Sequence, residues 1–424
     1  MRGARAGGIA GVLLALSCGP AQTLPGDALE PIRIGVIMPL SGELGSDGPD
    51  WVNGIRLATR EINAAGGPLP GRQVQLVILD GETNPDVGRM RAEDLVAMGV
   101  AGVIGDAGSG SSIAVYEVTQ PAQIPQLSCC STSPTLTLIN RELPESERYF
   151  FRTSPPDDLQ SVVVGDIAEN EADCQNLAIL HLDDAYGTPF GEGIEANARS
   201  RGINVVARVP YMDGQPRYTT EVGMIAAASP QPDCIALVAF PQSAGIIVRD
   251  WNRIMSRPAV TWIGTDGIRT NSIIDEVGDP NLIDNFYGTA PVTDDPAEPA
   301  NQAFVERFVA TFGERPAPFV SNSYDATALL LLGIAAAGST EGPLVRDGIR
   351  ALADPSATSF VRAGNLVEAL RLLREGRTVN YEGASGPVDV DLEGNVVTDY
   401  EVWRFQASTR SFVTVRIVPA NSIP

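Results

Sequence analysis

The first part of the chain alternates between short apolar runs and longer stretches with helical spacing. Residues 32–38 read IRIGVIM, a composition typical of a strand buried on both faces. The following stretch, 51–65, places Val52, Ile55 and Ile62 on one face at helical spacing. The alternation continues with strands expected at 74–80, 100–105 and 124–128 and helices at 85–98 and 111–120. Short strands separated by helices predict right-handed βαβ units around a parallel sheet.

The alternation starts again further along the chain and predicts a second lobe. Its strands are expected at 177–181, 203–209, 234–240 and 260–263, and its helices at 188–201, 218–228 and 243–255. Two long helical patterns follow, at 300–313 and 321–337, and then a hairpin signature at 388–391 and 396–405 around the turn 392–395. Because 424 residues are too many for one ordinary core, two α/β lobes are the simplest interpretation.

Three loops that follow predicted strands carry polar groups suited to a small charged ligand. Residues 105–112 (GDAGSGSS) and 128–134 (SCCSTSP) offer hydroxyls and backbone N–H groups at helix starts, which suit a carboxylate. Residues 264–267 (GTDG) place the carboxylate of Asp266 after a strand of the second lobe. Ligands of open α/β sheets bind beyond the carboxyl ends of the strands, so an anion cradle facing an acid predicts a zwitterion site. Ordinary turns and helix caps are the alternative.

The first 17 residues predict a signal peptide rather than a part of the fold. Arg2 and Arg5 precede an apolar stretch about half as long as the ~20 residues that a membrane span needs. The stretch ends in ALSC, which resembles a bacterial lipobox and predicts lipid attachment at Cys18; ordinary cleavage near Ala21 is the alternative. Residues 18–30, rich in Pro, Gly and polar residues, would then form a tether.

Composition narrows the function classes. The chain carries a formal net charge of −22, and all 30 of its basic residues are arginine. Such a charge disfavours binding to nucleic acid or to an anionic membrane surface. A Walker A loop requires lysine, and neither a G-x-S-x-G elbow nor zinc-ligand spacing occurs in the sequence. His181, the one histidine, has no evident catalytic partner, so the sequence predicts a protein without enzymatic activity, cofactor or metal.

A family resemblance extends over nearly all of residues 31–408. It is carried by eight strings: IRIGVIMPLSG (32–42), EINAAGG (61–67), VIGDAGS (103–109), STSPTLT (131–137), FRTSPPD (151–157), DDAYG (183–187), SYDATALLL (323–331) and YEGASGPVDVD (381–391). In this order they resemble the type I periplasmic binding proteins of the leucine/isoleucine/valine-binding family, which serve ABC transporters.

The resemblance implies two flavodoxin-like lobes, joined by three crossovers, that close on a ligand like a hinge. By analogy, lobe 1 would hold residues 31–152 and 290–379. Lobe 2 would hold residues 153–289 and 380–424.

The resemblance also implies a ligand site between the lobes. Ser109, Ser131 and Thr132 match positions that bind the ligand carboxylate and part of its ammonium group. Cys130 matches a neighbouring backbone contact. On the other side, Tyr186 matches an aromatic that covers the ligand, Asp266 matches an acid that pairs with the ammonium group, and Tyr324 is expected near the cleft.

The sequence departs from the family pattern at several of these positions. Asp47 stands where some members place an aromatic over the ligand side chain, and Phe240 with Pro241 replaces a tyrosine-rich stretch. Asp266 is one methylene shorter than the glutamate usual there. If Asp47 faces the cleft, the ligand side chain is polar or cationic, because a carboxylate facing hydrocarbon without a partner is costly. A solvated position at the rim is the alternative.

Four cysteines follow Cys18 in a compartment that permits disulfides. Cys174 precedes the first strand of the second lobe and Cys234 begins its third. These two strands are neighbours in the strand order of the family, so we expect a Cys174–Cys234 disulfide. Cys129 and Cys130 are adjacent, and we expect two buried thiols there rather than a vicinal disulfide.

The functional expectation is an exported, periplasmic, lipid-anchored monomer. It would bind a small amino-acid-like ligand for an ABC transporter permease, and it would touch the membrane only through its N-terminal lipid. A ligand-sensing module that reports to a regulator is the alternative, because the same fold serves both functions.

Overall fold

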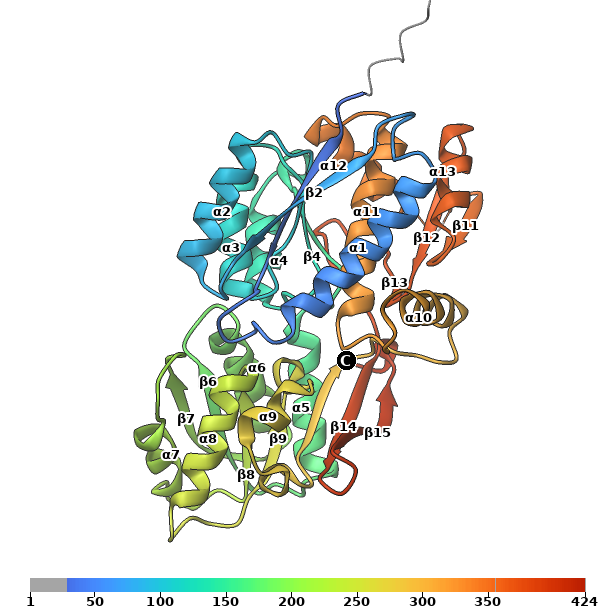
Figure 1. Ribbon diagram of the computed structural model, residues 1–424. Coiled ribbons are helices and arrows are strands. Elements are labelled where there is room, and N and C mark those ends of the chain that lie inside the picture. The colour runs from blue at the N-terminus through green and yellow to red at the C-terminus, as the bar shows by residue number, and fades with distance from the viewer. Residues whose placement is uncertain (1–28, 355, 424) are drawn as a thin grey trace, which may run out of the picture.

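Two sheets with parallel cores organise the chain (Figure 1). The computed structural model describes residues 29–354 and 356–423, so the expected signal peptide, Cys18 and most of the tether lie outside the described residues. Lobe 1 is built on a five-stranded parallel sheet in the order β2-β1-β3-β4-β5. Its strands are β1 (Ile32–Met38), β2 (Val74–Asp80), β3 (Val103–Gly105), β4 (Gln126–Ser128) and β5 (Phe150–Arg152).

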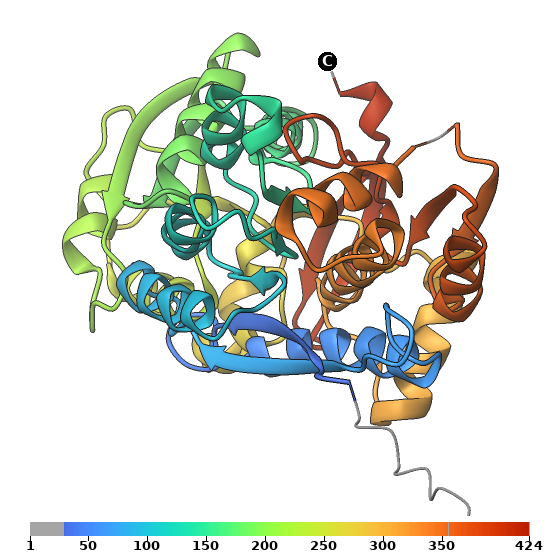
Figure 2. The same cartoon turned by 90° about the horizontal axis from the view of Figure 1, so that it is seen from above.

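Helices cover both faces of this sheet (Figures 1 and 2). One face carries α2 (Pro85–Ala97), α3 (Ser109–Thr119) and α4 (Pro134–Glu142), and the other carries α1 (Gly48–Ala64), α11 (Val320–Ala337) and α12 (Gly342–Ala351). Among the described residues, α11 is the one helix long and apolar enough to cross a membrane. Because 83% of it is buried inside lobe 1, it is a core helix.

Lobe 2 contains a seven-stranded sheet in the order β15-β14-β10-β9-β8-β6-β7. The strands are β6 (Asn176–Leu182), β7 (Asn204–Tyr211), β8 (Cys234–Val238), β9 (Thr261–Gly264), β10 (Tyr287–Pro291), β14 (Tyr400–Gln406) and β15 (Ser411–Val418). The helices are α5 (Asp157–Asn170), α6 (Gly187–Ser200), α7 (Thr219–Ala226), α8 (Pro241–Arg253) and α9 (Ser272–Val277). β14 and β15 are antiparallel additions to an otherwise parallel sheet.

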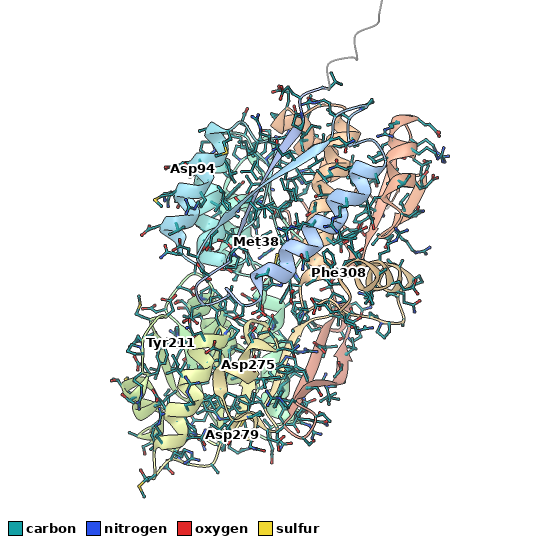
Figure 3. The ribbon with its side chains drawn as sticks, viewed as in Figure 1. Met38, Asp94, Tyr211, Asp275, Asp279 and Phe308 are labelled. Carbon is teal, nitrogen blue, oxygen red and sulfur yellow. A yellow bond between two sulfur atoms is a disulfide. The ribbon has the colours of Figure 1, made fainter. Side chains whose placement is uncertain are left out.

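The carboxyl ends of the parallel strands in both lobes face the junction between the lobes. Met38 ends β1 and Tyr211 ends β7, and both lie on the side of their lobe that faces the other lobe (Figure 3). This is the edge at which open α/β sheets bind ligands.

The chain crosses between the lobes three times, after β5, after β10 and before β14. Hydrogen bonds hold the first two crossovers to the start of α11: Thr153 exchanges bonds with Asn322 at 2.9 and 2.6 Å, and Ser321 donates to the carbonyl of Thr293 at 2.8 Å. β10 pairs with β14 as far as Pro291, so the second crossing lies just after residue 290 rather than at it.

The third crossing lies later than the expected boundary at residue 380. Residues 380–395 belong with lobe 1, where β12 (Val379–Gly383) and β13 (Gly386–Pro387) form a small sheet with β11 (Ser359–Arg362) beside α10 (Pro299–Phe312) and α13 (Leu366–Arg374). The physical reason is Asp325 of α11, whose buried carboxylate accepts hydrogen bonds from the Tyr381 hydroxyl and from the backbone N–H groups of Ala384 and Ser385.

No hairpin forms around residues 392–395, so that prediction is wrong, and the reason is again a contact with lobe 1. The turn itself forms, but the carbonyl of Gly394 accepts a 2.9 Å hydrogen bond from the N–H of Arg152, which ties the turn to lobe 1. The C-terminal hairpin is instead β14 and β15, joined through residues 407–410.

The structure joins Cys174 to Cys234 by a disulfide at the amino ends of β6 and β8, as the strand order led us to expect. The bond closes a loop of 60 residues that includes β6, α6, β7 and α7. It therefore links the first and third strands of lobe 2 along the chain.

Replacing both Cys174 and Cys234 with alanine should lower the free energy of unfolding by about 4 kcal/mol, because the unfolded chain regains the freedom of a 60-residue loop. Denaturant unfolding measures this difference. A non-reducing peptide map of the unmodified protein should recover the two cysteines in one linked peptide. Recovery of both as free thiols would contradict the pairing.

Candidate ligand-binding site

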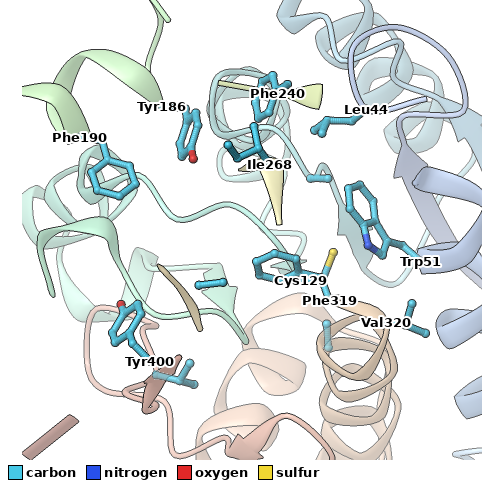
Figure 4. Close-up of a cluster of buried hydrophobic side chains, with 14 of the residues drawn as sticks. Leu44, Trp51, Cys129, Tyr186, Phe190, Phe240, Ile268, Phe319, Val320 and Tyr400 are labelled. Carbon is cyan, nitrogen blue, oxygen red and sulfur yellow. The ribbon is translucent and has the colours of Figure 1, made fainter. Parts of the chain in front are cut away.

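One cavity lies between the two lobes and is lined by both. Its empty space is about 510 Å³ when the open mouth is counted. Lobe 1 contributes Leu44, Asp47, Trp51, Ala107, Ser109, Cys130, Thr132, Pro318 and Phe319, and lobe 2 contributes Tyr186, Phe240, Asp266, Gly267, Arg269 and Thr270. Figure 4 shows its aromatic part, with Trp51 and Phe319 from lobe 1 and Tyr186 and Phe240 from lobe 2.

In lobe 1, three hydroxyl groups bonded to one backbone carbonyl hold the two binding loops together. The carbonyl of Asp106 accepts hydrogen bonds from the hydroxyls of Ser112, Ser128 and Ser131 at 2.8, 2.7 and 3.1 Å. The carbonyl belongs to the loop after β3, whereas Ser128 ends β4 and Ser131 lies in the loop that follows it. These bonds therefore fix the two loops against each other.

Arg152, the last residue of β5, supports the loop after β4. Its fully buried guanidinium donates to the carbonyls of Ser131 and Ser133 at 3.2 and 3.0 Å. Its Nε and Nη2 also donate to Asn395 Oδ1 at 2.9 and 2.7 Å. Burial lowers the pKa of Arg152 to about 10, so the group stays charged at neutral pH.

Ser109 and Thr132 form the hydroxyl-bearing wall of the cavity. Ser109 opens α3 and accepts a 3.2 Å hydrogen bond from the N–H of Ser133, so its own proton remains available to a ligand acceptor. Thr132 lies two residues before α4, the helix that Ser133 caps through the N–H of Thr135. Hydroxyls beside two helix starts favour a negatively charged ligand group.

Cys130 lies between these hydroxyls and is bonded to its neighbour. The structure joins Cys129 and Cys130 in a vicinal disulfide, so the expectation of two free thiols is wrong. Adjacent cysteines in an oxidising compartment meet the chemical requirement for such a bond. Cys129 is buried, whereas half-buried Cys130 faces the cavity.

In lobe 2, Tyr186 holds Asp266 in place and is itself packed against Phe240. The hydroxyl of Tyr186 donates to Asp266 Oδ1 at 2.9 Å, and its ring stacks on Phe240 with centroids 5.3 Å apart. Gly267 follows Asp266 because space is short there: a Cβ atom would lie 2.5 Å from the carbonyl of Ala239. The loop after β9 therefore places the acid at the cavity wall.

A second buried acid, Asp157, lies near Asp266. Asp157 is the first residue of α5 and is fully buried. Burial and then the negative charge of Asp266 raise the pKa of Asp157 well above its usual value. Burial raises the pKa of Asp266 to about 6.

Direct contacts join the lobes beside the cavity. Asp47 of lobe 1 accepts hydrogen bonds at Oδ1 from the hydroxyls of Thr270 and Ser272 of lobe 2, at 2.5 and 2.8 Å. Glu43 accepts a 3.0 Å bond from the N–H of Ser243 in the first turn of α8. The lobes are thus in contact across the cleft, and the contacts on lobe 1 are carboxylates.

The sequence of the chain matches that of a known protein family. The family model of the periplasmic binding proteins matches residues 31–399. The chain belongs to this family. Its members are solute-binding proteins, which agrees with a cavity shared by two lobes.

Two relatives illustrate the similarity in sequence. The chain is 28% identical to the chemotactic signal transduction system substrate-binding protein BasB of Halobacterium salinarum, over 88% of this chain and 86% of that protein. It is also 28% identical to an amino acid binding protein of Pseudomonas aeruginosa, over 78% of this chain and 85% of that protein.

Solved structures share the fold of this periplasmic binding protein. The leucine binding protein LivK of Thermotoga maritima superimposes with a TM-score of 0.76 at 19% identity, covering 92% of this chain and 99% of that one. The LivJ protein of Streptococcus pneumoniae, solved in complex with isoleucine, gives 0.72 at 19% identity, with coverages of 92% and 99%. These structures support the two-lobed α/β fold.

Most residues singled out in the sequence line the cavity of this binding protein, and two do not. Ser131 is buried, and its hydroxyl is occupied by the carbonyls of Asp106 and Ala107. Tyr324 lies inside lobe 1, where its hydroxyl donates to Glu61 at 2.7 Å. Both therefore support the fold rather than the cavity.

Sequence reasoning missed several lining residues, which are Leu44, Trp51, Ala107, Gly267, Arg269, Thr270, Pro318 and Phe319. The sequence places Trp51 in a predicted helix and gives no sign that it lines a cavity. In the structure its Nε1 donates a 2.9 Å hydrogen bond to the carbonyl of Pro318, in the segment before α11. Phe319 has no motif around it. It adopts a left-handed backbone with φ of 64°, which is unusual for an aromatic residue, at the start of α11.

Asp106 makes the stability of the protein depend on pH. Burial raises the pKa of Asp106 to about 7, whereas the unfolded value is about 4, so the folded state holds a proton that the unfolded state releases. The stability that Asp106 contributes is therefore present below about pH 4 and is lost as the pH rises to about 7, by on the order of 4 kcal/mol.

Asp106→Asn removes this titration while keeping the shape of the side chain. We expect the variant to melt several degrees above the parent at pH 8 and to match it near pH 4, measured by thermal unfolding across that range. Equal melting temperatures at pH 8 would show that folding does not raise the pKa of Asp106.

Proposed function

We propose that this binding protein captures an amino-acid-like zwitterion between its lobes and delivers it to an ABC transporter permease, without catalysing a reaction. The observation that carries the proposal is a single cavity with hydroxyls at helix starts on lobe 1 and the carboxylate of Asp266 on lobe 2. A carboxylate and an ammonium group on one small molecule complement these two walls.

In this proposal, Ser109 and Thr132 donate to the ligand carboxylate, beside the backbone of Cys130. Asp266 pairs with the ammonium group, and Tyr186 orients Asp266 through its hydroxyl. Because the ligand would contact both lobes, its binding would shift the population toward the closed state. Closure is the signal that a permease would read.

The names of relatives support an amino-acid ligand. The Pseudomonas relative is named for amino acid binding, and two of the structural neighbours are named for leucine binding and for branched-chain amino acid transport. The fold also hosts other small carboxylates, since a neighbour from Rhodopseudomonas palustris was solved with benzoate.

A sensing function is the second candidate, because the relative BasB is named for chemotactic signal transduction. The two functions differ in the partner rather than in the ligand site. Purified protein loaded with ligand should stimulate ATP hydrolysis by a reconstituted cognate transporter if transport is the function. Stimulation of a receptor alone would favour sensing.

Asp266→Asn should weaken binding of the cognate amino acid by about 10- to 100-fold, because a charge-assisted bond to the ammonium group is lost. Ser109→Ala should weaken it by a smaller factor. Calorimetric titration measures both. An analogue without the amino group serves as the control, since its affinity should respond to Ser109→Ala and not to Asp266→Asn. Unchanged affinity of Asp266→Asn for the amino acid would exclude the proposed pairing.

We further propose that the protein is exported, monomeric and lipid-anchored at Cys18 in the periplasm. Cys18→Ser should move it from the membrane fraction to the soluble fraction of a bacterial host, because one modified residue would supply the anchor. Detergent phase partitioning of both forms measures the change. If the unmodified protein is already soluble, cleavage without lipidation is correct.

A further inference from the structure

Asp47 carries an unmatched negative charge at the wall of the cavity. Its side chain is only 7% exposed and lines the cavity. The hydroxyls of Thr270 and Ser272 both donate to Oδ1, and among the described residues no group donates to Oδ2. One oxygen of a nearly buried carboxylate therefore remains for a ligand.

No described cation neutralises this charge. Arg269 also lines the cavity, but its Nε lies 2.9 Å from Glu401 Oε1 and its guanidinium stacks over Phe412, so its charge is already matched. Asp50, on the next turn of the chain, is also acidic, and the charge of Asp47 helps to raise its pKa. Buried carboxylates are normally paired, so this end of the cavity lacks a cation.

The surface around the two acids is apolar. Leu44, Trp51 and Phe319 line the same cavity as Asp47 and Asp266 (Figure 4). Such a lining suits a chain of methylene groups, and an aromatic ring such as that of Trp51 also attracts a cation. A branched aliphatic side chain would satisfy this lining but would leave Asp47 unpaired.

We propose that the cognate ligand is an amino acid with a cationic side chain, an ammonium or a guanidinium group, for which Asp47 is the counter-ion. This rests on the proposed function, in which Asp266 pairs with the α-ammonium group. Asp47 is then the specificity-determining residue of the site, and its contact with Thr270 and Ser272 couples side-chain recognition to closure of the lobes.

The test compares cationic amino acids with neutral ones of similar size. Calorimetric titrations of the purified protein would use arginine against citrulline, its neutral near-isostere, and ornithine and lysine against norleucine and leucine. At least one cationic ligand should bind tenfold or more tightly than its neutral counterpart. This comparison needs no variant.

Asp47→Asn extends the test. Asparagine keeps an oxygen that can accept the two hydroxyls of lobe 2, so the variant removes the charge while preserving the contact between the lobes. The ratio of cationic to neutral affinity should fall toward one. Asp94→Asn, the same change on α2 away from the cavity, is the matched control and should keep the ratio of the parent (Figure 3).

The outcomes separate the two proposals. If leucine, norleucine or citrulline binds as tightly as the cationic ligands, or if Asp47→Asn leaves the ratio unchanged, the inference about Asp47 is wrong while the amino-acid function stands. If no amino acid binds and another solute does, the proposed function fails, and the inference fails with it.

Discussion

The buried charge of Arg152 is the constraint on which the binding site depends. Its guanidinium binds the carbonyls of Ser131 and Ser133 and the side chain of Asn395, so the end of β5 is joined to two other parts of the chain. Removing a partner from a buried charge costs several kcal/mol, so these bonds favour one position for the loop after β4 and for the turn before the third crossover. Hinge motion is therefore expected beyond these residues, in the short segments that lead into α5 and β14.

The hydroxyl groups around Asp106 extend the same rigidity to the other binding loop. Ser112, Ser128 and Ser131 converge on one carbonyl, so the two loops that hold Ser109 and Thr132 behave as one unit. Under the proposed function, the wall for the ligand carboxylate is preorganised in lobe 1, and lobe 2 supplies the acid for the ammonium group. A preorganised wall reduces the ordering that binding requires.

Most of the fold could be predicted because the parallel strands are short, buried and apolar, and the helices between them keep regular spacing. The third crossover could not be. The residues around Gly394 have the composition of a hairpin turn, and only the hydrogen bonds to Arg152, more than 240 positions away, assign them to lobe 1. The strands β11–β13 are likewise held by the buried carboxylate of Asp325, a contact that local patterns do not contain.

The binding site was predictable only where loops follow strands. Ser109, Thr132 and Asp266 belong to such loops and line the cavity, whereas Ser131 has the same chemistry but points its hydroxyl at backbone carbonyls. Trp51 and Phe319 reach the cavity through packing between α1 and the start of α11, so no motif marks them. The sequence marked Asp47 as a departure from the family pattern. It could not identify the hydrogen-bond partners of Asp47, because they belong to the other lobe.

The acids of the cleft also explain why closure should depend on a ligand. Asp47, Asp266 and Glu43 are buried where the lobes meet, and burial raises the pKa of all three, so their charged forms are disfavoured there. Hydroxyl and N–H donors replace only part of the lost hydration. A ligand cation, as proposed, would offset that cost where the lobes are in contact. Because a ligand shifts an equilibrium only by its differential affinity for the two states, a cation that pairs with these acids only when the lobes are in contact would favour the closed state.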